Sequence, residues 1–347
     1  MKNILFFFTA TYPYGFGETF IENEIHYLAK SFDSIIIVSN NLTDTQTRKV
    51  PSNVTCLRMN YELSYAQKLS ALTHIFHPLF WHEIQIIRTR YKKRISRLIL
   101  FTVLQSLQKA LFLKKKIQKI ITTHSHTNDS IYLYSYWNND TAFALSYLKQ
   151  SILTQKCISR AHRWDVYFEV NKAQYLPFKQ YILEKSDGIS FIAEEGANYY
   201  KNLFPEYANK MYLSHLGVNI PDIQAAKKHN HLRIVSCSNI IPVKRVHVIA
   251  EALEKISPEI TIEWIHFGAG TELNSLQEYC KKKLNPLAHI SYTFAGQKTN
   301  KEVLSFYSKN YIDIFINVSS SEGIPVSIME AQSYGIPCIA TDVGGNS

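Results

Sequence analysis

Near its C-terminal end the chain reads SSSEGIPVSIMEA, from Ser319 to Ala331. The polar run that ends at Gly323 is typical of a loop, and the apolar residues after Pro325 favour a helix. Pro325 suits the first turn of that helix, and Gly335 suits the position just after its last turn. The stretch therefore predicts a loop that leads directly into a short helix.

Two glutamates in this stretch, Glu322 and Glu330, are separated by seven residues. Helical side chains tilt toward the helix N-terminus, so Glu330 is expected to point back at the loop that holds Glu322. A carboxylate accepts two hydrogen bonds side by side, which suits a vicinal diol, and the free N–H groups of a helix start suit a phosphate. The alternative is that both glutamates only cap and decorate a surface helix.

Upstream of this stretch, apolar runs alternate with segments of helical spacing. Such alternation predicts an α/β fold with parallel sheets covered on both faces. A polar interruption at 219–231 reads as a linker, so we expect two Rossmann-like, doubly wound domains, 1–218 and 232–347. The expected strands are 3–9, 35–38, 131–135, 157–159, 188–192, 211–215, 234–237, 263–267, 290–294, 312–316 and 338–341.

Composition agrees with two globular domains. The chain has 347 residues, of which 46% are hydrophobic, and no apolar run reaches the roughly 18 residues of a membrane span. The apolar start is followed by Glu18 and by no small-residue cleavage site, so it is expected as a buried strand, not a signal peptide. The five cysteines are scattered without metal-ligand or redox spacing, which favours a reducing cytoplasm.

Positive charge concentrates in residues 88–119, which contain eleven lysines and arginines and no acidic residue, against a net charge of +10 for the whole chain. Apolar residues recur there at helical spacing, which predicts a basic amphipathic surface. An anionic membrane on the cytoplasmic side and a plain solvated helix face both fit this pattern. A nucleic acid fits less well, because no aromatic-interleaved basic motif appears.

Residues 319–345 closely resemble the signature of the family-4 retaining glycosyltransferases of GT-B architecture, the glycosyl transferases group 1. The resemblance implies that Glu330 holds the ribose of a nucleotide-sugar donor and that Glu322 contacts the transferred sugar. It also implies that the intervening backbone borders the sugar and the diphosphate, at Gly323, Ile324, Pro325 and Val326.

Other segments resemble the same family. Residues 12–20 resemble its first glycine-containing loop, which gives Gly15 and Gly17 an acceptor- or phosphate-binding role. Residues 160–165 resemble its histidine loop, so His162 is expected to contact substrate, although a histidine after a strand is often structural. Residues 216–218 resemble its entry to the linker.

A basic pair follows the first strand of the second domain, in the run NIIPVKR from Asn239 to Arg245. Lys244 fits the family's diphosphate-binding lysine. Asn239 stands where the family has arginine and Arg245 where it has glycine, so Arg245 is expected to restore the missing charge. A solvated Lys-Arg pair is the alternative.

A glycine pair, Gly268 and Gly270, also follows a strand, and in the resembling family this loop borders the base. The third glycine of a dinucleotide fingerprint is replaced by Leu273, which argues against NAD. Plain turn glycines are the alternative.

The resemblance implies a retaining transfer in which the departing phosphate assists the acceptor hydroxyl, so that no protein nucleophile is needed. No Asp-x-Asp pair occurs, so no metal cofactor is expected, and Lys244, Arg245 and helix N-termini would stabilise the leaving diphosphate. The implied partners are a UDP- or GDP-linked sugar and a glycan or lipid-linked acceptor, in polysaccharide or lipopolysaccharide synthesis.

Two alternatives stay open: a nucleotide-sugar epimerase of the same fold, and a non-catalytic sugar-nucleotide-binding fragment. Because the chain ends at Ser347 inside the family signature, the second domain is expected to be incomplete and its transferase activity weak.

Overall fold

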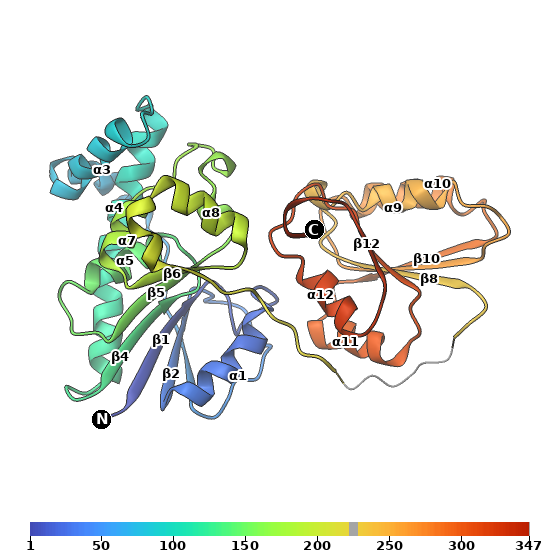
Figure 1. The fold of residues 1–347 in the computed structure, drawn as a ribbon, viewed down its shortest axis with the longest axis horizontal. Helices are drawn as coiled ribbons and strands as arrows, with labels where there is room; N and C mark the ends of the chain where they lie inside the picture. The colour runs from blue at the N-terminus through green and yellow to red at the C-terminus, as the bar shows by residue number, and fades with distance from the viewer. Residues whose placement is uncertain (222–227, 347) are drawn as a thin grey trace. The chain divides into compact units, whose positions relative to one another are not determined.

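The computed structural model describes residues 1–221 and 228–346. The chain divides into two compact units, residues 1–215 and 216–347. Each unit carries one parallel β-sheet with helices on both faces (Figure 1). The expected linker at 219–231 includes residues 222–227, which lie outside the described residues.

The sheet of the first unit has seven strands in the order β3-β2-β1-β4-β5-β6-β7, and every pairing is parallel. Its strands are β1 (Asn3–Thr9), β2 (Ser34–Ser39), β3 (Val54–Arg58), β4 (Ser130–Ser135), β5 (Lys156–Ala161), β6 (Gly188–Phe191) and β7 (Met211–Leu213). Its helices are α1 (Ile21–Ser31), α2 (Tyr65–Ser70), η1 (Ala71–Phe76), α3 (Pro78–Thr89), α4 (Arg97–His124), α5 (Asp140–Leu148), α6 (Arg163–Val166), η2 (Phe168–Val170), α7 (Lys179–Lys185), α8 (Glu194–Leu203) and η3 (Pro205–Lys210).

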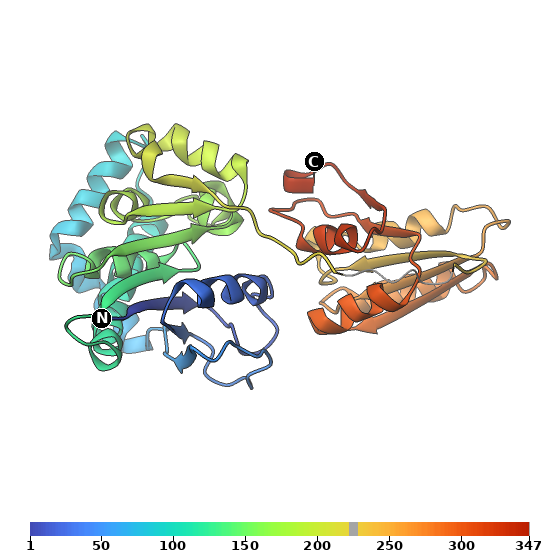
Figure 2. The same cartoon turned by 60° about the horizontal axis from the view of Figure 1, so that its bottom comes forward.

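Strand β1 shows why the apolar start of the chain forms the centre of this sheet. Phe6 and Phe8 pack into one hydrophobic cluster with α4, α5 and α7, whereas Leu5 and Phe7 pack into another with α1. Successive side chains of a strand point to opposite faces, so a strand buried on both faces must be apolar throughout. Figures 1 and 2 show α1 on the opposite side of the sheet from α4 and α5.

The second unit repeats this plan with five parallel strands in the order β10-β9-β8-β11-β12. Helices α9 and α10 cover one face, and α11 and α12 cover the other. The strands are β8 (Leu232–Cys237), β9 (Ile262–Phe267), β10 (Ile290–Gly296), β11 (Ile314–Asn317) and β12 (Cys338–Ala340). The helices are η4 (Pro242–Lys244), α9 (His247–Leu253), α10 (Leu273–Lys283), α11 (Asn300–Lys309), α12 (Val326–Ser333) and η5 (Gly344–Asn346).

The strand order reverses once in each sheet, between β1 and β4 in the first unit and between β8 and β11 in the second. At such a reversal the connections leave toward opposite faces and open a crevice at the carboxyl ends of the strands, where ligands bind in this class of fold. The topology thus points to the ends of β1 and β4, and to the ends of β8 and β11.

The structure confirms the expected α/β class and all eleven predicted strands. It adds β3 and the three helical segments α2, η1 and α3, which were not predicted. Strand β3 lies at the sheet edge and is only partly buried, so its residues show no continuous apolar run. Helix α2 has no buried residue at all, and its sequence therefore lacks a helical apolar stripe.

Candidate active site

Glu322 lies in the loop that leaves β11, and three side chains converge on it. Lys244 Nζ donates to Glu322 Oε1 at 2.5 Å, Ser319 Oγ at 2.6 Å and Asn317 Nδ2 at 3.1 Å. Burial alone would raise the pKa of Glu322, but these donors outweigh it and hold the pKa below its ordinary value. Glu322 is therefore an anion at neutral pH, fixed by one cation and two neutral donors.

Lys244 reaches Glu322 from the loop after β8, the strand next to β11. The two loops are also joined through their backbones, because Ser320 N donates to Val243 O at 2.8 Å. An ammonium carries three donors, and its side chain is 23% exposed here. The pair consequently sets the position of a partly exposed cation at the carboxyl edge of the sheet.

Arg245 is turned toward this same loop. It has a left-handed backbone, with φ of 47°, and its Nε and Nη2 donate to the carbonyls of Val318 and Ser319 at 2.9 and 3.2 Å. The guanidinium therefore holds the backbone that carries the Glu322 loop. The expectation that Arg245 adds charge at a diphosphate stays a prediction.

Two glycines press against the Glu322 loop from the segment after β12. A Cβ on Gly344 would lie 2.0 Å from the carbonyl oxygen of Glu322, and one on Gly345 would lie 2.1 Å from that of Gly323. Gly345 N donates to Gly323 O at 3.0 Å. No side chain fits between these backbones, so the segment after β12 fixes the position of the Glu322 loop.

Glu330 lies on α12 and is 9% exposed. Asn300 Nδ2, at the start of α11, donates to Glu330 Oε1 at 2.6 Å. Cys237, at the end of β8, is within electrostatic range of Glu330 and of Lys244, and burial raises the pKa of its thiol to about 12. The end of β8 therefore lies near both Glu330 and Lys244.

The predicted loop residues between the two glutamates follow the expected course. Pro325 is buried and immediately precedes α12, and Gly335 has φ of 71° just after the helix. A left-handed residue there ends a helix in the way the sequence indicated. The half-buried members of the run are Gly323, Ile324 and Val326.

The loop after β9 packs tightly on the loop after β8. A Cβ on Gly268 would lie 1.9 Å from Ser238 O, and one on Gly270 would lie 2.2 Å from Ile240 O. The buried ring of His266 connects the same loops, with Nε2 3.1 Å from Ser238 O and Nδ1 2.8 Å from Ser236 Oγ. These glycines therefore permit close backbone approach, beside the exposed Asn239.

In the first unit, His162 follows β5 and is 6% exposed. Its ring lies 4.2 Å from that of Trp137 and 5.1 Å from that of Tyr136, measured between centroids. Burial, with the positive charge of Arg160 nearby, lowers the pKa of His162 to about 3. Both ring nitrogens are buried without a protein hydrogen-bond partner, so a neutral imidazole has donor and acceptor capacity unused.

A buried polar network underlies the His162 loop. Asp165 Oδ1 accepts from His162 N at 2.6 Å, and Oδ2 accepts from Asn138 N at 2.7 Å. Lys179 donates to the carbonyl of Asn138. Burial raises the pKa of Asp165 to about 6 and lowers the pKa of Lys179 to about 8. The network connects the ends of β4 and β5 and fixes the histidine backbone.

The glycine-containing loop after β1 is organised by Glu18. Its carboxylate accepts from the backbone N–H groups of residues 10, 11 and 12 at 2.6 to 2.9 Å, and from Trp137 Nε1 at 2.6 Å. Gly15 has φ of 60°, and a Cβ on Gly17 would lie 2.5 Å from Thr11 Oγ1. These three amides therefore bind the chain's own carboxylate, and the predicted ligand role of Gly15 and Gly17 stays a prediction.

The smaller of two adjoining cavities opens at the β1 and β4 ends, as the topology indicates. They measure about 260 and about 520 Å³. Thr9, Ser135 and Trp137 line the smaller one, whereas Lys179 and Tyr175 line the larger. Both are lined by Glu62, Lys109, Asn139, Asp140 and Trp164. The first unit thus offers a polar cavity with an indole wall, of a size that suits a sugar.

Several residues of these sites were not predicted from the sequence. Asn317 and Ser319 adjoin Glu322 in sequence, so their position at the end of β11 was the available signal. Asn300 and Glu18 gave no local signal, because their partners lie on other loops. Within 1–221 and 228–346, no group of three His, Cys, Asp or Glu side chains is arranged to hold a metal ion.

The basic stretch 88–119 includes most of α4, whose apolar stripe is buried in the core of the first unit. Some of its cations have partners: Arg90 pairs with Glu206, Lys109 with Glu62, and Lys116 Nζ donates to Asn60 O. Among the described helices, none is both long and apolar enough to cross a bilayer.

Comparison with known proteins identifies the second unit. Residues 221–347 match the family model described as Glycosyl transferases group 1. The O-antigen biosynthesis glycosyltransferase WbnH of Escherichia coli is 24% identical over 203 residues, which cover 55% of this chain and 52% of that protein. The chain spans about half the length of the O-antigen relatives that it matches.

Solved structures share the fold. The lipopolysaccharide outer core galactosyltransferase WaaB matches with a TM-score of 0.58 at 15% identity, over 99% of this chain and 81% of that one. Anabaena Alr3699/HepE in complex with UDP matches with a TM-score of 0.57 at 12% identity, over 99% of this chain and 81% of that one. At these identities the likeness shows a shared GT-B fold.

Proposed function

We propose that this chain, whose residues 221–347 form a domain of the Glycosyl transferases group 1 family, transfers a sugar from a nucleotide-sugar donor to a glycan acceptor in cell-surface polysaccharide synthesis. The observation that carries the proposal is the Lys244–Glu322 pair at the carboxyl edge of the second sheet. It places a positioned cation and an ionised carboxylate together where this fold binds its ligands.

The donor is proposed to bind the second unit through three charged side chains near the carboxyl ends of its strands. Lys244 would contact the diphosphate, Glu322 the transferred sugar and Glu330 the ribose hydroxyls. Helix α12 starts at Val326 beside the Glu322 loop, and its N-terminal end adds a positive dipole. We favour a UDP-sugar over a GDP-sugar as the donor, because HepE, which shares the fold, was solved in complex with UDP.

Transfer is proposed to retain the anomeric configuration without a metal. The bond between the anomeric carbon and the phosphate oxygen breaks, and a bond from the acceptor oxygen forms on the same face. The acceptor proton passes to the departing phosphate. Lys244 offsets the charge that develops on that phosphate, and Glu322 keeps the lysine in place.

The acceptor is proposed to occupy the first unit's cavities, with Trp164 as an apolar wall for a sugar face. His162 lines neither cavity but packs on Trp137, which lines the smaller one, and its substrate contact is proposed through a ring that stays neutral at physiological pH. A lipid-linked glycan is the proposed acceptor, which implies work at the cytoplasmic face of the membrane.

A thermal-shift panel of UDP-, GDP- and ADP-sugars tests the donor proposal, because a ligand that binds the native state raises the melting temperature. We expect a UDP-sugar to give the largest shift, and EDTA to leave both the shift and subsequent transfer unchanged. No shift with any sugar nucleotide, or conversion of the donor to another sugar nucleotide without acceptor, would contradict the proposal.

A further inference from the structure

Exposed apolar side chains gather in one part of the first unit. Of the 20 large hydrophobic residues that are exposed among the described residues, eight lie within 65–101, about a tenth of the chain. This segment, here called the helical block, comprises α2, η1, α3 and the start of α4 (Figure 1). Its most exposed members on the first three elements are Tyr65, Leu69, Leu72, Ile75, Phe76 and Trp81, at 40 to 87% exposure.

The helical block is well formed in spite of this exposure. Ser64 and Gln67 form a capping box at the start of α2, and Pro78 opens α3. Phe80, Ile84 and Ile87 anchor α3 in the core, which leaves Trp81 on the outer face. The apolar side chains therefore belong to the outer surface of ordered helices, where water contact is unfavourable.

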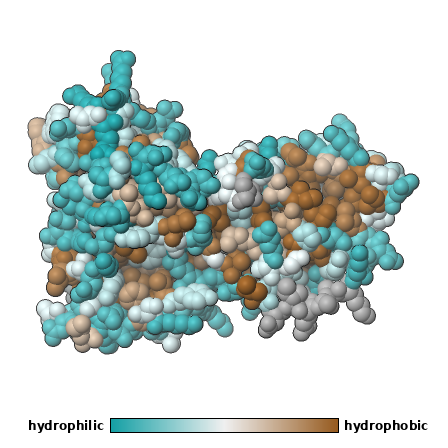
Figure 3. Space-filling model, in the orientation of Figure 1, coloured by the Kyte–Doolittle hydropathy of each residue, from teal (hydrophilic) through white to brown (hydrophobic). Residues whose placement is uncertain are grey.

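The charge of the helical block has one sign. Between residues 65 and 101 the sequence has seven lysines and arginines, and Glu83 is the sole acidic residue. Glu83 is 1% exposed and accepts from Tyr175 OH and Phe178 N, so it adds no surface charge. The exposed cations are Lys68, Arg88, Lys92, Arg94 and Arg97. Figure 3 shows hydrophobic residues interspersed with hydrophilic ones over this end of the unit.

The helical block also borders the larger cavity. Lys68 of α2 and Leu98 of α4 line that cavity, and Leu98 is itself 48% exposed. Phe101, one turn further along α4, is 47% exposed. A ligand in the cavity with an apolar extension could continue along this surface without entering water.

From these observations we infer that the helical block docks on an anionic lipid bilayer, with its aromatic and aliphatic side chains inserted between the headgroups and its cations on the lipid phosphates. Apolar and basic residues together are what an interfacial surface requires, because each supplies one part of the binding free energy. Docking presents the cavity to a lipid-linked acceptor. That last consequence rests on the function proposed above, but the docking itself does not.

This surface differs from the one the sequence suggested. Residues 88–119 predicted a basic amphipathic surface that fitted either a membrane or a solvated helix face, and the apolar stripe of α4 in fact packs in the core. The helical block shares the cations of 88–97 with that stretch and takes its apolar residues from α2, η1 and α3.

Sedimentation of the full chain with phosphatidylglycerol-containing vesicles tests the inference without donor or acceptor. We expect Phe76→Ser combined with Trp81→Ser to reduce binding about tenfold, since two inserted side chains are lost. The matched control is Leu153→Ser, which removes a side chain that is 88% exposed elsewhere on the same unit. Equal loss in the control, or parental binding by the double variant, overturns the inference.

Charge reversal tests the electrostatic contribution to vesicle binding. Arg88→Glu combined with Arg94→Glu should weaken binding by more than tenfold, since each cation near an anionic surface contributes about fivefold. Lys281→Glu with Lys282→Glu, on α10, changes the net charge equally and should have little effect. Binding should also fall as salt rises. Equal effects of the two pairs would leave only nonspecific attraction and overturn the inference.

Fluorescence and turnover distinguish docking from the proposed function. Vesicles should shift the tryptophan emission of the parent to the blue, and Trp81→Phe should abolish that shift. A shift that persists in this variant, or self-association through the helical block on size-exclusion chromatography, overturns the docking. Vesicle binding that persists without any sugar transfer contradicts only the proposed function. If both hold, the Phe76 and Trp81 variant should lose turnover on a lipid-linked acceptor and keep it on a water-soluble one.

Discussion

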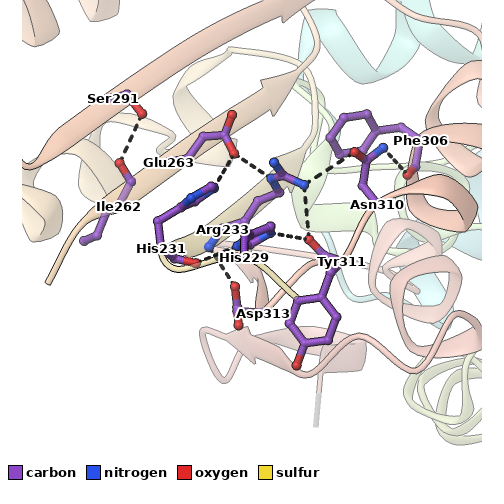
Figure 4. Close-up of polar contacts among 10 residues, drawn as sticks. All are labelled: His229, His231, Arg233, Ile262, Glu263, Ser291, Phe306, Asn310, Tyr311 and Asp313. Atoms are coloured by element: carbon purple, nitrogen blue, oxygen red, sulfur yellow. Dashed lines mark hydrogen bonds and ion pairs between the residues drawn. The ribbon is translucent and has the colours of Figure 1, made fainter. Parts of the chain in front are cut away.

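In the second sheet, networks of charged side chains lie at both ends of the strands, here called the amino edge and the carboxyl edge. The two networks differ in the backbone structure around them. At the amino edge, Glu263 Oε2 accepts from Arg233 Nε at 2.6 Å and lies 3.0 Å from His231 Nε2 (Figure 4). Arg233 N donates to Asp313 Oδ2 at 2.8 Å, and Arg233 Nη1 reaches Asn310. His229 stacks on His231 and lies 2.9 Å from Tyr311 O.

At the carboxyl edge, Glu322 also accepts from a cation and from neutral donors. Here, however, glycine backbones press against the loops from two sides, at Gly268 and Gly344. A helix also starts at the end of the loop. An ion pair alone therefore does not identify a ligand site. The strand ends on which it lies, and the backbone geometry around it, separate a site from a structural clamp.

The largest effect should follow Lys244→Ala. If the carboxyl edge stabilises a leaving diphosphate, loss of this cation should lower kcat by about 10²- to 10³-fold, as for removal of one preorganised donor at developing charge. Steady-state kinetics at saturating donor measures the change, with a melting curve to confirm folding. Lys281→Ala, on α10, is the control with unchanged kcat. A kcat within twofold of the parent would remove Lys244 from the mechanism.

Glu330→Ala should have the next largest effect, on donor affinity. Loss of a charged hydrogen-bond acceptor costs about 1.5 to 3 kcal/mol, so the Kd for UDP should rise about 10- to 150-fold. Titration calorimetry with UDP alone measures this, because the ribose is present without the sugar. Glu278→Ala, on the exposed side of α10, should leave the Kd unchanged. Parental affinity in Glu330→Ala would show that the ribose assignment is wrong.

Arg233→Met should distinguish the amino edge from the carboxyl edge most clearly, because it should lower stability without changing kcat. The change leaves Glu263 with His231 as its remaining side-chain partner and should lower the free energy of unfolding by about 1 to 3 kcal/mol. Urea unfolding followed by circular dichroism measures this. Because the amino edge lies away from the site, kcat per folded molecule should not change. A fall in kcat as large as that of Lys244→Ala would abolish the distinction between the edges.

The sequence alone predicted those features of the fold and the site that depend on local sequence patterns. Apolar runs such as 3–9 and 35–38 predicted the central strands, since a strand buried on both faces is apolar almost throughout. The helix that follows the Glu322 loop was predicted because Pro325 and Gly335 mark the start and the end of α12. Lys244 and Glu322 were expected at one ligand, and the structure joins them directly.

Contacts between distant segments could not be predicted. Asn300 binds Glu330 from another helix, and Gly344 abuts Glu322 through backbone atoms that carry no side-chain signal. The hydrogen bonds of Arg245 to the carbonyls of residues 318 and 319 also had no sequence signal, and its predicted contact with a diphosphate stays a prediction. Such contacts depend on tertiary packing, which single-sequence periodicity does not encode.

The smallest effect concerns pH and compares the carboxylates of the two edges. The donors Arg233 and His231 outweigh burial and hold the pKa of Glu263 below its ordinary value of 4.5. Because the folded pKa is the lower one, its contribution to stability is complete above that ordinary value and is lost as pH falls through the folded pKa. Glu263→Gln should therefore be less stable than the parent at pH 7, by about 1 kcal/mol for a partly exposed pair, and the difference should shrink in acid.

Glu322→Gln provides the matched measurement at the other edge. The pKa of Glu322 is also lowered, by Lys244, Ser319 and Asn317, so its stability difference should shrink over the same acid range with the same sign. Turnover at pH 7 should distinguish the two variants, because a neutral amide at position 322 no longer holds Lys244 as an ion pair. Urea unfolding at several pH values, followed by kinetics at pH 7, measures both. If the two variants show the same pH dependence and the same kcat, the carboxyl edge is a second structural clamp and the catalytic assignment fails.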